Sequence, residues 1–284
     1  MYKILENKKI SPDSYELIVE APLVIERCIP GQFAIVMSRE DSERIPLTIY
    51  DYDKKTGQLF LIYQIVGAST EELSKIQDKL YSVVGPLGRG NEICSNLEEF
   101  RDKRICYIAG GVGIAPVYPQ VKFLKEHGFD VDVIYGARTA KLLLIRNKIE
   151  KVVHKIRYAT DDGSFGEEGF VTDILKKHLE DYDIVVAIGP VIMMKNVVDL
   201  VRNLDIKTIV SMNPLMVDGS GMCGACRCEV GGKPKFACIH GPEFDGKEVD
   251  FDLALKRMNI YHEEEKEKWE KMRQVWMQEG VEHE

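Results

Sequence analysis

The sequence predicts an antiparallel β-barrel followed by a doubly wound α/β domain, a small cysteine-rich loop and hairpin module, and a C-terminal helix. Three observations support this prediction. The first hundred residues alternate short apolar strands with turns, the second hundred alternate strands with helices, and the stretch from 218 to 238 contains four of the seven cysteines. The expected boundaries are 1–98 for the barrel, 99–210 for the α/β domain, 211–250 for the cysteine module and 251–284 for the helical tail.

The barrel prediction rests on short apolar segments that are separated by glycine and proline. Turn residues stand at Pro30-Gly31, at Gly67 and at Gly85-Pro86. Regular short strands with such turn signals are typical of a small antiparallel barrel. The predicted strands are Tyr15–Val19, Gln32–Met37, Leu59–Val66 and Leu80–Val84.

The periodicity changes after residue 104. A continuous apolar run, typical of a buried parallel strand, opens into a glycine-rich turn and a helical pattern, and strands and helices then alternate as in a doubly wound sheet. The predicted strands are Ile105–Ala109, Val131–Tyr135, Ile156–Ala159 and Ile184–Ile188, and the predicted helices are Val117–His127, Leu142–Val153, Val171–His178 and Met193–Asn203.

Four motifs lie at the carboxyl ends of these strands, where such a sheet places its ligands. A buried strand followed by a glycine-rich turn into a helix is a phosphate-approach site, although the first motif is not the GxGxxG fingerprint and is weak alone. The combination of the four is more specific than any one of them. The motifs are Gly110-Gly111-Val112-Gly113-Ile114-Ala115-Pro116, Gly136-Ala137-Arg138, Asp161-Asp162-Gly163 and Gly189-Pro190-Val191-Ile192-Met193.

The cysteine module is the most informative stretch of the chain. It reads D-x4-C-x2-C-x11-C, with Asp218, Cys223, Cys226 and Cys238 at the four positions. A plant-type [2Fe–2S] site is spaced C-x4-C-x2-C…C, so the pattern is that of an iron–sulfur site whose first thiolate is replaced by a carboxylate. The glycines at 219, 221 and 224 suit a backbone that wraps closely around a cluster, often at positive φ.

Other interpretations of the cysteines stay open. Zinc fits less well, because Cys228 and Cys238 are too far apart to form a second short-spaced ligand pair beside Cys223 and Cys226. A redox disulfide and unligated thiols are further alternatives. Within the iron–sulfur interpretation, Cys228 competes with Asp218 as the fourth ligand.

Composition narrows the class of protein. A chain of 284 residues is long enough for two domains and a small module. Its residues are 45% hydrophobic and 30% charged, as in an ordinary globular protein. The net charge of −8 and the lack of a basic stripe argue against nucleic acid. No apolar signal region or span of ~18 apolar residues occurs, so we expect no export and no membrane span. Cysteines gathered in one loop suit a reducing cytoplasm.

The order of the barrel motifs resembles the flavin-binding barrel of the ferredoxin-reductase superfamily. The resemblance implies that FAD binds there, with the Thr48 hydroxyl and the neighbouring backbone beside the isoalloxazine. Tyr63 and Gln64 would flank the ribityl chain or pyrophosphate, and the turn at Gly67 would bind phosphate. Arg44 stands one residue before the family's arginine position, which Ile45 occupies. The implied flavin contacts are Arg44, Pro46, Leu47, Thr48, Tyr63, Gln64, Gly67, Ser69 and Thr70.

The α/β motifs resemble the nicotinamide-nucleotide domain of the same superfamily. The resemblance implies NAD(H) as the nucleotide, with NADP(H) as the alternative, and many relatives have a cysteine where this chain has Ile188. Hydride transfer between two rings needs apposition rather than a protein acid or base, so no catalytic residue is predicted. The implied contacts are Gly110, Gly111, Val112, Gly113 and Pro116 at the cofactor, Gly136, Arg138, Asp161 and Asp162 at its ribose and adenine, and Gly189, Pro190 and Met193 near the nicotinamide.

A cluster loop and a hairpin (Arg227–Val230 and Lys235–Ala237 around Gly231-Gly232) follow the two domains. This order resembles the electron-transfer subunit of dihydroorotate dehydrogenase. The aspartate at 218 is similar to that of the small subunits of NADH-dependent reduced ferredoxin:NADP oxidoreductases, also known as sulfide dehydrogenase subunits. The chain is thus identified as a flavin barrel, a nucleotide-binding α/β domain and an iron–sulfur module.

The resemblance implies an electron path. NADH would reduce FAD by hydride transfer, and single electrons would pass through the [2Fe–2S] cluster to a larger subunit in a heterodimer. That partner would carry a second flavin and [4Fe–4S] clusters, exchange electrons with ferredoxin and support electron bifurcation between NADH, NADPH and ferredoxin. The alternatives are a dihydroorotate dehydrogenase partner and, from another class, a non-catalytic regulator that binds metal or nucleotide.

The sequence of the tail, from residue 251 onward, predicts one or two helices. Trp269, Met272, Val275 and Trp276 recur at helical spacing and form one stripe. The stripe either covers the chain's own core or docks a partner subunit, since tryptophan is enriched among interface anchors.

Overall fold

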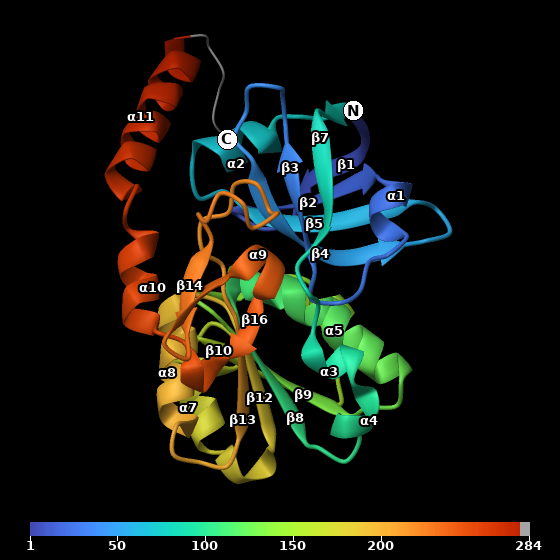
Figure 1. The fold of residues 1–284 in the computed structure, drawn as a ribbon, viewed down its shortest axis with the longest axis vertical. Coiled ribbons are helices and arrows are strands. Elements are labelled where there is room, and N and C mark those ends of the chain that lie inside the picture. Colours follow the sequence, from blue (N-terminus) through green and yellow to red (C-terminus); the bar gives the residue numbers. More distant parts are fainter. Residues whose placement is uncertain (279–284) are drawn as a thin grey trace.

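The computed structural model describes residues 1–278, and the side chains through residue 274. Figure 1 shows two lobes, an antiparallel barrel above and a mainly parallel sheet flanked by helices below, with the C-terminal helices along one side. This is the fold class that the sequence predicts. The division of the chain at residues 98, 210 and 250 stays a prediction.

The barrel is a seven-stranded antiparallel sheet in the order β6-β1-β2-β5-β4-β3-β7. The predicted strand Leu80–Val84 is divided between β6 and β7 at Tyr81, whose backbone N–H bonds to the Met37 carbonyl at 3.0 Å. This break moves the chain from one edge of the sheet to the other and nearly closes the barrel. The elements are β1 Tyr2–Lys9, β2 Ser14–Glu20, α1 Pro22–Ile25, β3 Phe33–Met37, β4 Ile45–Asp53, β5 Gln58–Gln64, α2 Ala68–Ser74, β6 Lys79–Leu80 and β7 Ser82–Leu87.

The lower lobe is a seven-stranded sheet in the order β11-β10-β9-β8-β12-β13-β16, parallel except at β16. Every residue of β8 is buried, as its apolar run predicts. The elements are α3 Glu92–Ser95, α4 Leu97–Phe100, β8 Ile105–Gly110, η1 Gly111–Gly113, α5 Ile114–Glu126, β9 Val131–Ala137, η2 Ala140–Leu142, α6 Arg146–Ile149, β10 Lys155–Thr160, β11 Glu167–Glu168, α7 Val171–Lys176, η3 Leu179–Asp181, β12 Ile184–Ile188, α8 Val191–Val201 and β13 Lys207–Ser211.

The helix predicted over Leu142–Val153 is wrong in extent, because only α6 (Arg146–Ile149) is α-helical there. Ile145 before it has φ 44°, a left-handed conformation that is rare for a β-branched residue and that interrupts a helix. Leu143 and Leu144 are buried without being helical. Their burial produced an apolar pattern that imitated helical periodicity.

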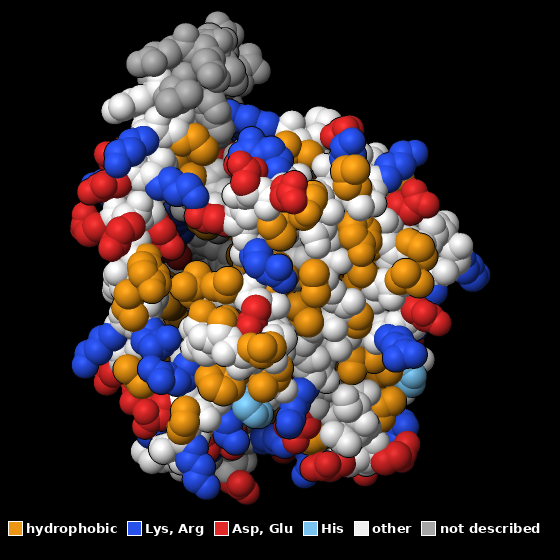
Figure 2. Space-filling view, turned by 45° about the horizontal axis from the view of Figure 1, so that its top comes forward, with side chains coloured by type: hydrophobic (Ala, Val, Ile, Leu, Met, Phe, Trp, Pro, Cys, Tyr) orange, Lys and Arg blue, Asp and Glu red, His pale blue; other side chains and the backbone are white. Residues whose placement is uncertain are grey.

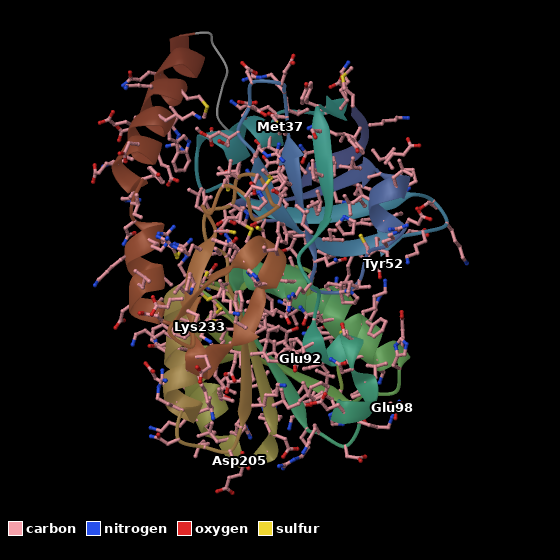
Figure 3. The ribbon with its side chains drawn as sticks, viewed as in Figure 1. Met37, Tyr52, Glu92, Glu98, Asp205 and Lys233 are labelled. Atoms are coloured by element: carbon pink, nitrogen blue, oxygen red, sulfur yellow. The ribbon has the colours of Figure 1, made fainter. Side chains whose placement is uncertain are left out.

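The cysteine module contains the predicted hairpin. Strands β14 (Arg227–Val230) and β15 (Lys233–Phe236) pair around Gly231 and Gly232, which both have positive φ, as a type I′ turn requires. The second strand ends at Phe236, one residue before the end of the predicted range, Ala237. Lys233 begins β15, at the outer edge of the module in Figure 3. The remaining elements are α9 Ala237–His240, β16 Glu243–Asp245, η4 Gly246–Glu248, α10 Phe251–Met258 and α11 His262–Gln278.

The terminal helix α11 lies against α2 of the barrel. The Trp269 indole N–H donates to the Glu71 carboxylate, Lys268 pairs with Glu43, and the Arg273 guanidinium stacks over the Trp269 ring at 4.3 Å. Trp269 therefore covers the chain's own barrel. The side chains of the other predicted stripe members at 275 and 276 lie outside the described residues.

A buried polar network lies near α3 in the lower lobe. Asn91 and Gln120, both fully buried, donate their side-chain N–H groups to the two carboxylate oxygens of Glu243 at 2.7 and 2.6 Å. Beside them, Glu92 on α3 pairs with Lys207 on β13 at 2.7 Å, and Figure 3 shows Glu92 within the lower lobe. Burial outweighs these hydrogen bonds and raises the pKa of Glu243 to about 7.

We expect Glu243→Gln to flatten the pH dependence of folding stability. A folded pKa above the unfolded value means that Glu243 contributes stability below pH ~4.5 and that this contribution is lost as the pH rises through about 7. The loss is on the order of 3 kcal/mol. Urea unfolding at several pH values between 4.5 and 8 measures it, with Glu180→Gln as an exposed control. Equal slopes in wild type and Glu243→Gln would contradict the assignment.

Candidate functional site

Two glycine-rich turns meet at the carboxyl ends of β8 and β12. A Cβ on Gly113 would lie 2.2 Å from the Ile188 carbonyl oxygen, and one on Gly189 would lie 3.0 Å from the Gly110 nitrogen. A Cβ on Gly110 would in turn lie 2.5 Å from the Met193 sulfur. These positions need glycine because the two turns touch. The first and fourth predicted nucleotide motifs therefore form one surface.

The backbone at Gly111 is open. Its φ is 54°, and a Cβ there would meet no atom within 4 Å. The buried Tyr135 hydroxyl donates to the Gly111 carbonyl at 3.1 Å and fixes the turn from below. Helix α5 begins three residues later, and its first turn accommodates Pro116 without losing a helical hydrogen bond. An open glycine backbone at the start of a 13-residue helix fits an anionic nucleotide.

The other two nucleotide motifs lie beside each other on β9 and β10. The Asp161 and Asp162 N–H groups bond to the carbonyls of Ala137 and Arg138 at 3.2 and 3.3 Å. A Cβ on Gly136 would lie 2.5 Å from Val171, so this glycine lets α7 approach the sheet. The Arg138 side chain is exposed. All four motifs thus lie along one edge of the parallel sheet.

The barrel faces this edge. Gln64, at the end of β5, donates to Asp13 at 2.6 Å. Burial acts to raise the pKa of Asp13, but the bonds from Gln64, Ser14 and Ser11 and the charge of Arg138 outweigh it and lower that pKa. Strand β5, which ends at Gln64, also contacts the η1 turn of the lower lobe, so the barrel lies against the nucleotide edge of the sheet.

Other predicted flavin residues already have partners within the protein. Tyr63 is buried inside the barrel, where its hydroxyl donates to Asn7 at 3.0 Å, so its side chain is turned away from the predicted role. The Thr70 hydroxyl accepts from the Val66 and Gly67 amides and caps α2 itself. Ser69 donates to Glu43.

Residues 44–48 occupy the start of β4. Pro46 and Thr48 are partly exposed, Leu47 is buried, and Thr48 lies opposite Phe33 on β3. The Arg44 side chain is directed toward the cysteine loop rather than along the barrel. It donates to the carbonyls of Val217 and Asp218 at 2.6 and 3.4 Å and so holds the cysteine loop. Its predicted phosphate role stays a prediction.

The cysteine loop lies on the barrel. Gly219, Gly221 and Gly224 have φ of 76°, 81° and 68°, as the glycine pattern predicts. A Cβ on Gly219 would lie 2.6 Å from Leu87 and 2.8 Å from Ile35, which belong to β7 and β3. The loop therefore touches the barrel strands directly.

The four predicted cluster ligands gather at this loop. The Cys226 and Cys238 sulfurs are buried and 3.2 Å apart, whereas Cys223 is exposed. The Asp218 carboxylate accepts from the Ser220 and Cys223 amides at 2.9 and 2.8 Å, and these backbone bonds lower its pKa to about 2. Burial, the bond with Cys226 and the charges of Cys226 and Asp218 raise the pKa of Cys238 to about 12.

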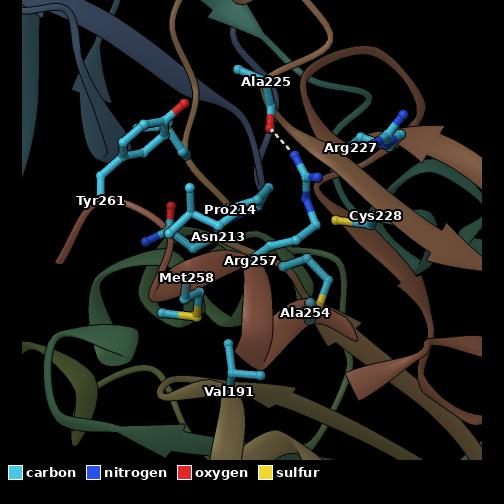
Figure 4. A pocket seen from close by; sticks show the side chains of 13 residues that line it. Val191, Asn213, Pro214, Ala225, Arg227, Cys228, Ala254, Arg257, Met258 and Tyr261 are labelled. Carbon is cyan, nitrogen blue, oxygen red and sulfur yellow. Dashed lines mark hydrogen bonds between the residues drawn. The ribbon is translucent and has the colours of Figure 1, made fainter. Parts of the chain in front are cut away.

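The alternative ligand Cys228 faces elsewhere. Its side chain lines a cavity of about 190 Å³ between the loop and α10, which the other three cysteines of the loop do not line (Figure 4). Burial raises its pKa to about 11. This position favours Asp218 over Cys228 as the fourth ligand.

The donor set matches that of a two-iron cluster. Among residues 1–274, whose side chains the structure describes, no three His, Cys, Asp or Glu side chains are arranged around a single metal position. Two adjacent buried thiols, an exposed thiol and an ionised carboxylate match the four ligands of a [2Fe–2S] cluster.

Sequence models of two families match the chain. The iron–sulfur cluster binding domain of dihydroorotate dehydrogenase B matches residues 213–250, and the oxidoreductase NAD-binding domain matches residues 107–199. A dihydroorotate dehydrogenase B electron-transfer subunit homologue of Thermotoga maritima is 42% identical over 95% of this chain and 94% of its own length. The electron-transfer subunit of Clostridium acetobutylicum is 33% identical over 87% of this chain and 95% of its own length.

The chain belongs to the family of dihydroorotate dehydrogenase B electron-transfer subunits and their homologues. A chain of the NADH-dependent reduced ferredoxin-NADP oxidoreductase structure, described for flavin-based electron bifurcation, matches with a TM-score of 0.86 and 39% identity over 96% of this chain and 98% of that one. Plasmodium falciparum ferredoxin-NADP+ reductase, at 15% identity and a TM-score of 0.60 over 74% of this chain and 94% of that one, shares the fold.

The predicted family and cofactor classes are thereby confirmed. This chain is an electron-transfer oxidoreductase subunit whose cofactors are FAD, an iron–sulfur cluster and NAD(H). It acts with a larger partner subunit. Within the described residues, no helix is long and apolar enough to cross a bilayer.

Contacts between the lobes were not predicted from the sequence. Lys148 on α6 pairs with Glu16 on β2 at 3.1 Å, and the Tyr50 hydroxyl donates to the same carboxylate oxygen at 2.5 Å. Lys122 on α5 pairs with Asp51 on β4 at 2.9 Å. None of these residues stands in a motif, so no local signal identifies them.

We expect Asp218→Cys to retain a cluster with an altered EPR signal and midpoint potential, because a carboxylate is a harder ligand than a thiolate. Asp218→Ala should lose iron or change the EPR signal, whereas Cys228→Ala should keep both. Iron content and EPR of the reduced proteins measure this. Unchanged Asp218→Ala together with iron loss in Cys228→Ala would assign the ligand to Cys228.

Proposed function

We propose that this subunit takes electrons from NADH and delivers them one at a time to a larger redox subunit. The cofactors supply hydride acceptance by flavin, conversion from two-electron to one-electron chemistry, and single-electron delivery by a [2Fe–2S] cluster. The observation that carries the proposal is that the loop with Asp218 and the three cysteines touches barrel strands β3 and β7, while strand β5 of the same barrel contacts the η1 turn at the nucleotide edge of the parallel sheet.

The protein's part in hydride transfer is to hold two rings together. Ion pairs from Lys148 to Glu16 and from Lys122 to Asp51 fasten the sheet lobe to barrel strands β2 and β4. Proximity and orientation of this kind supply much of the rate when no acid or base is needed. The open Gly111 backbone would take the nucleotide phosphates, and residues 44–48 of β4 would meet the flavin.

NADH is proposed over NADPH. The Arg138 side chain is exposed at the ribose end of the predicted site, but Asp161 and Asp162 follow β10 and lie beside it. Two carboxylates there disfavour a 2′-phosphate and suit ribose hydroxyls.

Anaerobic addition of NADH should bleach the visible absorption of flavin in the purified protein and then produce the EPR signal of a reduced [2Fe–2S] cluster. NADPH at the same concentration should act more slowly. Protein that contains neither flavin nor iron, with no response to NADH, would instead support the non-catalytic regulator.

The larger partner is proposed to carry flavin and [4Fe–4S] clusters and to exchange electrons with ferredoxin in a cytoplasmic, electron-bifurcating heterodimer. The match at 39% identity to the NADH-dependent reduced ferredoxin-NADP oxidoreductase supports this over a dihydroorotate dehydrogenase partner. Both proposals predict a heteromeric complex. Purification from the native host separates them, because the first requires a co-purifying iron–sulfur flavoprotein and the second a pyrimidine-forming flavoprotein.

An apolar surface beside the cluster loop suits this partner. Leu215, Met258, Ile260 and Tyr261 line one cavity and are each 50–52% exposed, and Met222 at the tip of the loop is 89% exposed. Figure 2 shows apolar side chains gathered on this face. Contiguous exposed apolar residues mark interaction sites, and electrons that leave the cluster must cross a nearby surface.

We expect Met258→Lys with Ile260→Lys to weaken the complex with the partner at least tenfold while NADH still bleaches the flavin. Co-purification and analytical ultracentrifugation measure the complex. Leu23→Lys, on α1 at the far side of the barrel and 81% exposed, is the matched control. An intact complex in the double variant would place the interface elsewhere.

A further inference from the structure

Arg257, near the end of α10, reaches the cluster-binding loop from behind. Its Nη2 donates to the carbonyl oxygen of Ala225 at 3.2 Å, and Figure 4 shows this bond crossing the cavity between loop and helix. Ala225 lies between the predicted ligands Cys223 and Cys226. A shift of its carbonyl would therefore move both thiols.

The helix that carries Arg257 is itself fixed. The Asp250 carboxylate accepts from the Leu253 amide at 2.8 Å and caps α10 at its N-terminus. Ala254 and Leu255 pack against the same core that contains Cys226, Cys228 and Cys238. The guanidinium thus projects from a rigid support, as a residue that positions a functional loop requires.

The charge of Arg257 is not neutralised by its surroundings. Its Nε is buried and has no hydrogen-bond partner among the described residues. No acidic side chain lines the cavity that it enters. A cation in this setting acts more strongly on nearby charge than one in water.

This charge lies beside the segment that carries the cysteines. The Ala225 carbonyl that Arg257 binds directly precedes Cys226, and Cys228 lines the same cavity, with its sulfur 3.8 Å from the Cys226 carbonyl oxygen. The guanidinium therefore places positive charge next to the backbone of Cys226.

We propose that Arg257 is a positioning residue for the cluster loop and that its charge raises the reduction potential of the cluster. The inference rests on the cluster of the proposed function. One-electron reduction by the flavin adds one negative charge to the cluster, and a nearby uncompensated cation stabilises that reduced state. The hydrogen bond to Ala225 keeps the charge at a fixed place.

Three variants of the full-length holoprotein separate charge from hydrogen bonding. Arg257→Gln keeps a donor for Ala225 but removes the charge, and Arg257→Lys keeps the charge. Arg227→Gln removes an exposed arginine that lines the same cavity and serves as the control. Iron per flavin, EPR of the reduced cluster and an EPR-monitored potentiometric titration are measured for each.

We expect Arg257→Gln to retain iron and to shift the reduction equilibrium about tenfold toward the oxidised cluster, which is about 59 mV for one electron. Arg257→Lys should stay near the wild-type potential, and Arg227→Gln should not change it. A wild-type potential in Arg257→Gln, or an equal shift in Arg227→Gln, would overturn the proposal.

If Arg257→Gln purifies without iron, the iron content and reduction potential of Arg257→Lys test the proposal instead. A retained cluster at the wild-type potential supports the proposal, whereas iron loss or a lowered potential in the lysine variant overturns it. The proposed function fails separately, because wild-type protein with no EPR signal after reduction would show that no cluster is present before any variant is compared.

Discussion

The structure depends on the close contact between the cysteine loop and the barrel. At Gly219 the loop backbone lies so close to barrel side chains that a Cβ would lie 2.6 Å from Leu87 and 2.8 Å from Ile35. The same glycine has φ 76°, a conformation that other residues adopt only at a cost. Arg44 then fastens the neighbouring carbonyls to the barrel. Because the barrel would hold the flavin, this contact fastens the loop that would hold the cluster to the same lobe.

The second constraint is the fixed orientation of the lobes. The charged pairs at Glu16 and Asp51 lie on the barrel side of the junction, and the buried Glu243 network lies near α3. Glu243 belongs to β16, which joins the edge of the parallel sheet after the cysteine loop. The loop is therefore held at both ends, by Arg44 on the barrel before it and by a sheet strand after it. Movement of one lobe would move the loop as well.

Local sequence patterns predicted much of this arrangement, because they depend on backbone preference and burial. The buried run of β8, the positive φ values at Gly219, Gly221 and Gly224 and the turn at Gly231-Gly232 all follow from neighbouring residues. The family resemblance supplied the cofactors, which composition alone could not.

Long-range contacts could not be predicted in this way. The strand β16 pairs with β13 although more than thirty residues separate them, and neither strand has a distinctive pattern. The partner of Arg44 lies in the loop rather than along the barrel, and the Tyr63 hydroxyl turns inward to Asn7. Arg257 stands in no motif, and only the folded chain brings it to Ala225. In each case the partner is set by tertiary structure, and the local sequence pattern is compatible with several partners.

The distribution of charge around the loop follows from what the loop must hold. The chain is acidic overall, with a net charge of −8, and the predicted exchange of a thiolate ligand for the Asp218 carboxylate would leave the ligand charge unchanged. Yet guanidinium groups bind backbone carbonyls on both sides of the ligands, Arg44 at 217 and 218 and Arg257 at 225. Both bind backbone oxygens, so neither is neutralised by a carboxylate through these bonds. In an acidic protein, two such cations beside the four predicted ligands would lower the electrostatic cost of accepting one more electron there.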